Sequence, residues 1–165
     1  MTADAKAVSP VMITLVRRGL LALTLIGIAA TAFELTTEHH WNGLEQLIPW
    51  FALTALTVAL VLAVMPSRGA QLLARVLALV VLGASVYGVL DHVTANYNSG
   101  PLDQRFADTW ESLSATQRWW YAFTKQVGPS PPLAPGVLAQ TALLLLLATV
   151  MRGKRAEPGP APAPV

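Results

Sequence analysis

Four long runs of apolar residues constrain the fold of this chain more than any other feature of its sequence. Two of them, residues 47–65 and 133–151, contain no charged side chain. The other two, residues 11–35 and 71–97, carry arginine near their starts and an acidic residue near their ends. About 20 apolar residues cross the ~30 Å hydrocarbon core of a bilayer, and arginine near a helix end reaches the interface. The sequence therefore predicts four transmembrane helices.

The composition is typical of a chain that lies in lipid rather than in water. Of the 165 residues, 54% are hydrophobic and only 12% are charged, whereas a soluble domain carries about 25% charged residues. We therefore expect an all-α integral membrane protein, an up-down bundle of four transmembrane helices. The 11 basic and 9 acidic residues exclude a nucleic-acid-binding protein with a broad basic face. The lack of cysteine excludes disulfides and thiolate metal sites.

The basic residues predict how the chain is oriented in the membrane. Eight fall at one end of the predicted helices: Lys6, Arg17, Arg18, Arg68, Arg75, Arg152, Lys154 and Arg155. Three fall at the other end: Arg105, Arg118 and Lys125. Because cytoplasmic loops are enriched in Lys and Arg, we expect a multi-pass protein of the cell (inner) membrane with both termini in the cytoplasm.

The two ends of the chain are expected to be disordered and cytoplasmic. Residues 1–10 lack a periodic pattern, and residues 152–165 are rich in proline and alanine. Residues 11–151 then form the transmembrane domain. One alternative stays open, because Ala30-Thr31-Ala32 follows an apolar stretch and resembles a secretory cleavage site. Cleavage there would leave three spans.

Ionisable residues gather near the predicted outer membrane edge. Glu34 follows Arg18 by 16 positions, and Asp91 follows Arg75 by the same 16. At 1.5 Å per helical residue, both acids lie close to the hydrocarbon boundary. Charged groups at that depth are costly, so they are candidates for function. With the adjacent histidines, the candidate site comprises Glu34, His39, His40, Asp91 and His92.

Several chemistries fit these five residues. Imidazole and carboxylate side chains with an open position form an exchangeable site for Zn²⁺ or Cu²⁺. The same groups also suit a proton-accepting network, because histidine titrates near neutral pH. Haem bound by His92 and His39 or His40 is a further option. A purely structural role, in which Glu34 and Asp91 end their helices, stays open beside them.

The predicted outer loop, residues 98–132, is too long for a plain connection. The 4, 4, 3 spacing of Leu102, Phe106, Trp110 and Leu113 predicts a short helix. Ser114 and Gln117 form a capping box that opens a second helix. We expect an amphipathic hairpin in the outer interface, serving as an aromatic anchor, a lid, or a docking surface for another membrane or extracytoplasmic protein. Its candidate interface residues are Trp110, Trp119, Trp120 and Phe123.

Two short elements, HHWNGLEQLIPW and GVLDHVTANYNSG, resemble those of small uncharacterised four-span bacterial inner-membrane proteins. The matching residues are His40, Trp41, Ile48, Pro49, Trp50, Gly88, His92 and Asn96. The resemblance covers roughly residues 11–100. It implies a bacterial inner-membrane location and no established activity.

Two classes of function follow. The first is a non-enzymatic accessory or scaffold component whose partners are the lipid bilayer and another protein. The alternative is a metal-binding (Zn or Cu) or proton-coupled membrane protein that uses the outer acid and histidine residues, and an enzyme would need the same residues. Whether Glu34, His40 and His92 converge on one cavity discriminates between the two classes.

Overall fold

The computed structural model describes residues 9–151, and the predictions for most of both chain ends lie outside this range. Four long helices dominate it: α1 (Pro10–Thr37), α2 (Leu44–Val64), α3 (Arg68–Ser99) and α5 (Ala134–Val150). The shorter elements η1 (Gly100–Leu102), η2 (Trp110–Ser112) and α4 (Ala115–Phe123) lie between α3 and α5. No strand occurs within the described range, so the all-helical prediction is confirmed there.

Three of these helices are long and apolar enough to cross a membrane. They are α1, α2 and α3, the last continuing through η1 to Leu102. The fourth apolar helix, α5, has 17 residues, which corresponds to about 25 Å at 1.5 Å per residue. The structure therefore confirms three helices of spanning length, and a fourth span stays a prediction.

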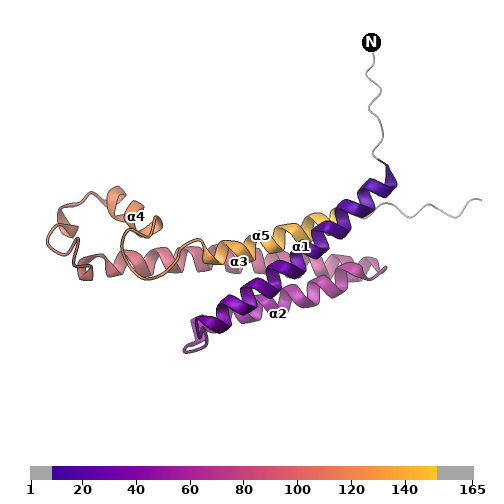
Figure 1. The fold of residues 1–165 in the computed structure, drawn as a ribbon, viewed down its shortest axis with the longest axis horizontal. Helices are drawn as coiled ribbons and strands as arrows, with labels where there is room; N and C mark the ends of the chain where they lie inside the picture. The colour runs from indigo at the N-terminus through magenta and orange to yellow at the C-terminus, as the bar shows by residue number, and fades with distance from the viewer. Residues whose placement is uncertain (1–8, 152–165) are drawn as a thin grey trace, which may run out of the picture.

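The four long helices lie side by side (Figure 1), and small residues are buried between them. α5 contacts α1, α2 and α3, and α2 contacts α1 and α3. Six alanines in these contacts are fully buried: Ala59, Ala63, Ala74, Ala78, Ala142 and Ala148. A Cβ atom on Gly27 would collide with the hydroxyl of Thr141, so glycine is required where α1 approaches α5. Small residues at helix contacts and large apolar residues outside are typical of membrane proteins.

Arginines from the starts of α1 and α3 bind the carboxyl ends of the neighbouring helices. Arg17 donates from Nη2 to the carbonyl of Ala63 at 2.7 Å and from Nε to that of Ala148 at 3.2 Å. Arg75 donates to the hydroxyl of Thr149 at 3.1 Å and to its carbonyl at 3.0 Å. The last carbonyls of a helix lack partners within the helix and carry partial negative charge. These arginines therefore connect four helix ends at one level.

At the opposite end, α3 extends past α5 and carries a small headpiece, residues 97–133 (Figure 1). Its core consists of Trp110, Ala122 and Val127, which pack on Val93 of α3. The capping box that opens α4 is confirmed, because the Ser114 hydroxyl accepts from the Gln117 backbone and the Gln117 side chain accepts from Ser114.

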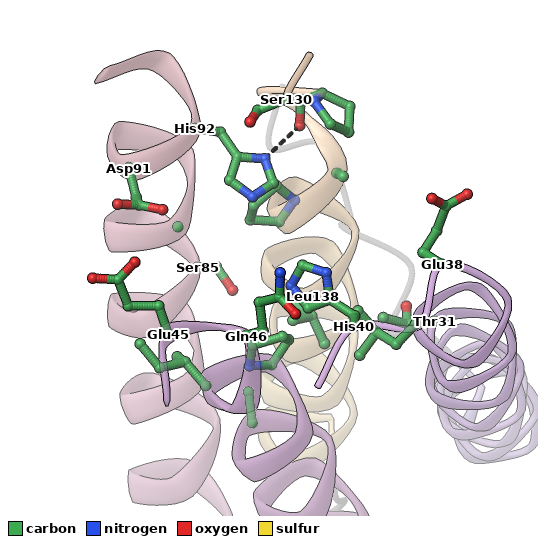
Figure 2. A pocket seen from close by; sticks show the side chains of 18 of the residues that line it. Thr31, Glu38, His40, Glu45, Gln46, Ser85, Asp91, His92, Ser130 and Leu138 are labelled. Atoms are coloured by element: carbon green, nitrogen blue, oxygen red, sulfur yellow. Dashed lines mark hydrogen bonds between the residues drawn. The ribbon is translucent and has the colours of Figure 1, made fainter. Parts of the chain in front are cut away.

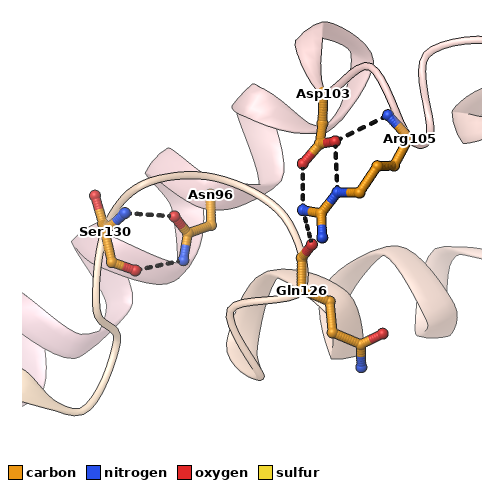
Figure 3. A network of polar contacts seen from close by, with 5 residues as sticks. All are labelled: Asn96, Asp103, Arg105, Gln126 and Ser130. Carbon is orange, nitrogen blue, oxygen red and sulfur yellow. Dashed lines mark hydrogen bonds and ion pairs between the residues drawn. The ribbon is translucent and has the colours of Figure 1, made fainter.

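The helix predicted over residues 102–113 is not present, which corrects the sequence interpretation. This stretch holds only the short 3₁₀ elements η1 and η2 with turns between them. Asp103 explains the difference (Figure 3). Its carboxylate accepts one hydrogen bond from the Arg105 backbone at 3.0 Å and another from the Arg105 guanidinium at 2.7 Å. Such local side-chain bonds compete with helix formation. The same guanidinium donates to the carbonyl of Gln126 at 2.6 Å, which joins the two halves of the headpiece.

Candidate functional site

A cavity of about 490 Å³ opens where the headpiece meets the helices (Figure 2). Its wall is built by the end of α1, the second half of α3, the starts of α2 and α5, and the segment that returns from α4. The buried side chains of Leu35, Ala52 and Leu138 contribute apolar surface to it. Gly88 lets α3 approach α5 here, since a Cβ atom would lie 3.0 Å from that of Pro135.

Four of the five predicted site residues line this cavity: Glu34, His40, Asp91 and His92. Figure 2 shows Asp91 and His92 entering from α3 and His40 from the α1–α2 loop. His39 does not line it. Its backbone has a positive φ of 51°, and its ring lies against Trp41 with the centroids 5.3 Å apart.

His92 is held in one orientation by the return segment, residues 124–133, which leads from α4 to α5. Its Nδ1 lies 2.8 Å from the carbonyl oxygen of Pro131 (Figure 2). A carbonyl only accepts, so Nδ1 must carry a hydrogen. The neutral ring therefore has Nε2 as a hydrogen-bond acceptor.

His40 is fixed through its backbone, whose carbonyl accepts from Nε1 of Trp50 on α2 at 2.8 Å. Burial lowers the pKa of His40 below its ordinary value of 6.5, and the nearby His92 lowers it further. Glu38 and Glu34 act in the opposite direction but do not reverse the shift. The His40 ring is therefore biased toward its neutral form.

Carboxylates outnumber cations around the cavity. Four acidic residues line it: Glu34, Glu38, Glu45 and Asp91. Lys125 is the one basic side chain among the described residues that line it. None of the four carboxylates takes part in an ion pair within residues 9–151, where the two ion pairs join Arg105 to Asp103 and Arg118 to Glu111.

The hydroxyl of Thr31 is a second unusual feature of the cavity wall. Thr31 is only 5% exposed, and its Oγ1 has no hydrogen-bond partner within the described part of the chain. Other threonines of α1 bond to their own helix, Thr24 to the Leu20 carbonyl at 2.8 Å and Thr36 to the Ala32 carbonyl at 2.7 Å. A buried hydroxyl without a partner costs about 1–3 kcal/mol. Thr31 therefore adds to the cavity wall a buried hydroxyl that has no protein partner among the described residues.

The metal prediction finds limited support in this geometry. Across residues 9–151, no three His, Cys, Asp or Glu side chains are grouped closely enough to hold one ion. A catalytic or exchangeable zinc site normally has three protein ligands. The cavity therefore does not form such a site in this conformation.

The predicted aromatic interface divides into an exposed and a buried part. Trp119, Trp120 and Phe123 are exposed on α4, and Trp119 stacks on Tyr97 with centroids 4.4 Å apart. Trp110 is 1% exposed and fills the headpiece core, so it is not available to a partner.

Comparison with protein-family models, with curated proteins and with solved structures finds no match to this chain. What the fold and site define is an all-helical protein with apolar helices compatible with a bilayer and an acidic cavity at one end.

Proposed function

We propose that this chain is a four-span membrane protein, an up-down bundle with both termini in the cytoplasm, and that it acts as a non-enzymatic accessory component. Its extracytoplasmic end binds a ligand. The convergence of Glu34, His40, Asp91 and His92 on one cavity carries the binding role. A metal centre stays second, because no three possible metal ligands are grouped within residues 9–151.

Contacts at the two ends of α5 support a fourth span. Near its carboxyl end, Thr149 binds Arg75, and just before its start the Pro131 carbonyl binds His92. Arg75 and His92 lie 17 residues apart on α3, or about 25 Å along the helix axis. α5 therefore runs beside the apolar part of α3 over nearly its full depth.

The two ends of the bundle also differ in how their polar groups are used. At the predicted cytoplasmic end, Arg17, Gln71 and Arg75 all donate to backbone carbonyls of neighbouring helices. At the predicted outer end, the carboxylates around the cavity are without ion-pair partners in residues 9–151. The carboxylates that lack an ion-pair partner in this range are therefore a feature of the outer end.

Native mass spectrometry of the purified protein tests the binding role. We expect the wild type to retain a small bound molecule, which Ala84→Phe, placed in the cavity wall, should lose. Ala30→Phe adds the same side chain at an exposed position of α1 and should retain it. No bound mass, or equal retention by both variants, contradicts the proposal.

The second candidate is a proton-coupled or Zn²⁺- or Cu²⁺-binding protein. The position of His92 near His40 favours it, because His92 contributes to lowering the pKa of His40. Zn²⁺ titration of the wild type and of a His40→Ala/His92→Ala double variant tests the metal. Binding that is lost in the variant, and that weakens on acidification because a coordinating imidazole must be neutral, supports this candidate.

A further inference from the structure

We infer that the outer cavity binds an amphipathic organic cation, a small molecule with a protonated amine on an apolar body. This inference rests on the proposed function, which makes the cavity a ligand site. Three independent properties of the cavity lead to it: its charge, its hydrogen-bonding groups and its apolar wall.

The charge selects a cation. Four acidic residues line the cavity, Glu34, Glu38, Glu45 and Asp91, together with one lysine, Lys125. A cleft lined by one sign of charge with low-dielectric walls concentrates ligands of the opposite sign. The surplus of negative charge therefore disfavours carboxylates and phosphates as ligands.

The polar atoms select a hydrogen-bond donor. The neutral His92 ring has an acceptor at Nε2, because Nδ1 is bound to the Pro131 carbonyl. The Ser85 hydroxyl already donates to the Val81 carbonyl at 2.9 Å, so it accepts only. The buried Thr31 hydroxyl has no partner within residues 9–151, and a hydroxyl can accept as well as donate. An ammonium group has three donors and no acceptor, which complements this set.

The size of the cavity and its apolar surface favour an organic molecule over a metal ion as the ligand. The cavity measures about 490 Å³, within the range of roughly 300–1,000 Å³ that small-molecule sites occupy. Leu35, Ala52 and Leu138 give it an apolar wall beside the carboxylates. No three His, Asp or Glu residues among the described ones are grouped to hold a metal ion.

Calorimetry in lipid nanodiscs, with three probes of the same shape, tests the inference. The probes are benzylammonium, neutral benzyl alcohol and anionic benzoate, each corrected for partition into empty nanodiscs. We expect benzylammonium to bind at least tenfold more tightly than benzyl alcohol, and benzoate not to bind. Equal affinity for the cation and the alcohol, or no binding of the cation, overturns the inference.

Variants locate the binding in the cavity. Glu34→Gln/Asp91→Asn should weaken benzylammonium binding about tenfold, whereas Asp108→Asn, an exposed acid outside the cavity, should not change it. Thr31→Val removes the unpartnered hydroxyl and should weaken binding without lowering the melting temperature. Equal losses in the double variant and in Asp108→Asn overturn the inference.

The two proposals fail separately. If the wild type retains a bound molecule that Ala84→Phe loses, but does not bind benzylammonium, only the proposed ligand class is contradicted. If Zn²⁺ binds and benzylammonium does not, the metal-binding candidate replaces the organic cation.

Discussion

Asn96 and Ser130 form a reciprocal pair of hydrogen bonds that closes the headpiece onto α3 (Figure 3). The Asn96 amide donates to the Ser130 carbonyl at 2.7 Å, and the Ser130 backbone donates to the Asn96 oxygen at 2.9 Å. The same amide donates to the carbonyl of Ala122 at 3.1 Å. Gly128, with φ of 76°, passes so close to Asn96 that a Cβ atom there would collide with it. One buried amide thus positions the segment that forms part of the cavity wall.

Replacing Asn96 with alanine should release the return segment. The change removes three hydrogen bonds of a fully buried side chain, and each backbone group left unsatisfied costs about 1–3 kcal/mol. Limited proteolysis from the outside should then cut residues 124–133 much faster than in the wild type. Asn98→Ala, at an exposed position two residues on, should leave the rate unchanged. Equal cutting of both variants would mean that other contacts hold the segment.

Trp110 and Trp120 should differ in their contribution to stability. Trp110 is buried against Gly100, whereas Trp120 is 58% exposed. Truncating a buried Trp to alanine costs about 3–5 kcal/mol, so Trp110→Ala should loosen the headpiece and Trp120→Ala should not. Hydrogen exchange of residues 97–127 measures the difference. Similar exchange in the two variants contradicts the packing described above.

Gly27 should tolerate no side chain. A Cβ atom would meet the Thr141 hydroxyl, so Gly27→Val forces α1 and α5 apart and should destabilise the bundle by more than 1 kcal/mol. At Gly19 nothing lies within 4 Å of the same Cβ position, so Gly19→Val is the matched control. Thermal unfolding in detergent compares them, and equal melting temperatures would exclude a close α1–α5 contact.

The protein should lose stability on mild acidification through His40. Burial and the neighbouring His92 lower the pKa of His40, so the unfolded chain binds the proton more readily than the folded protein. The contribution of His40 is therefore complete above pH 6.5 and falls as the pH drops through 6.5 to the folded pKa. The melting temperature should fall more between pH 8 and 5.5 in the wild type than in His40→Gln. His39→Gln, on the exposed neighbour, should behave like the wild type, and equal falls in all three contradict this.

The positions of the long helices could be predicted from the sequence because lipid burial demands long, uninterrupted apolar runs. The predicted runs 11–35, 47–65, 71–97 and 133–151 agree with the helix bounds to within three residues. The capping box at Ser114 was predictable for a similar reason, since its bonds are made within one turn.

The features that the sequence did not reveal depend on contacts between distant segments. Threonine in an apolar helix ordinarily bonds to its own turn, so no pattern marks Thr31 as unpartnered. Lys125 reaches the cavity only because the headpiece folds back. The sequence alone does not show which of the adjacent residues His39 and His40 lines the cavity. In the structure, His39 has a positive φ, and only the side chain of His40 lines the cavity.

Single-cysteine labelling tests the central claim, a four-span protein with its cavity on the extracytoplasmic face, and the natural chain contains no cysteine to interfere. Cysteines would replace Ser99 and Ser130 at the cavity end, and Ser67 and Met151 at the other end. In whole cells, an impermeant thiol reagent should label the first two and not the last two. Labelling at position 151 without labelling at position 67 would show that α5 does not cross the membrane as proposed. Labelling at positions 67 and 151 alone would show that the orientation in the membrane is the reverse of the one proposed.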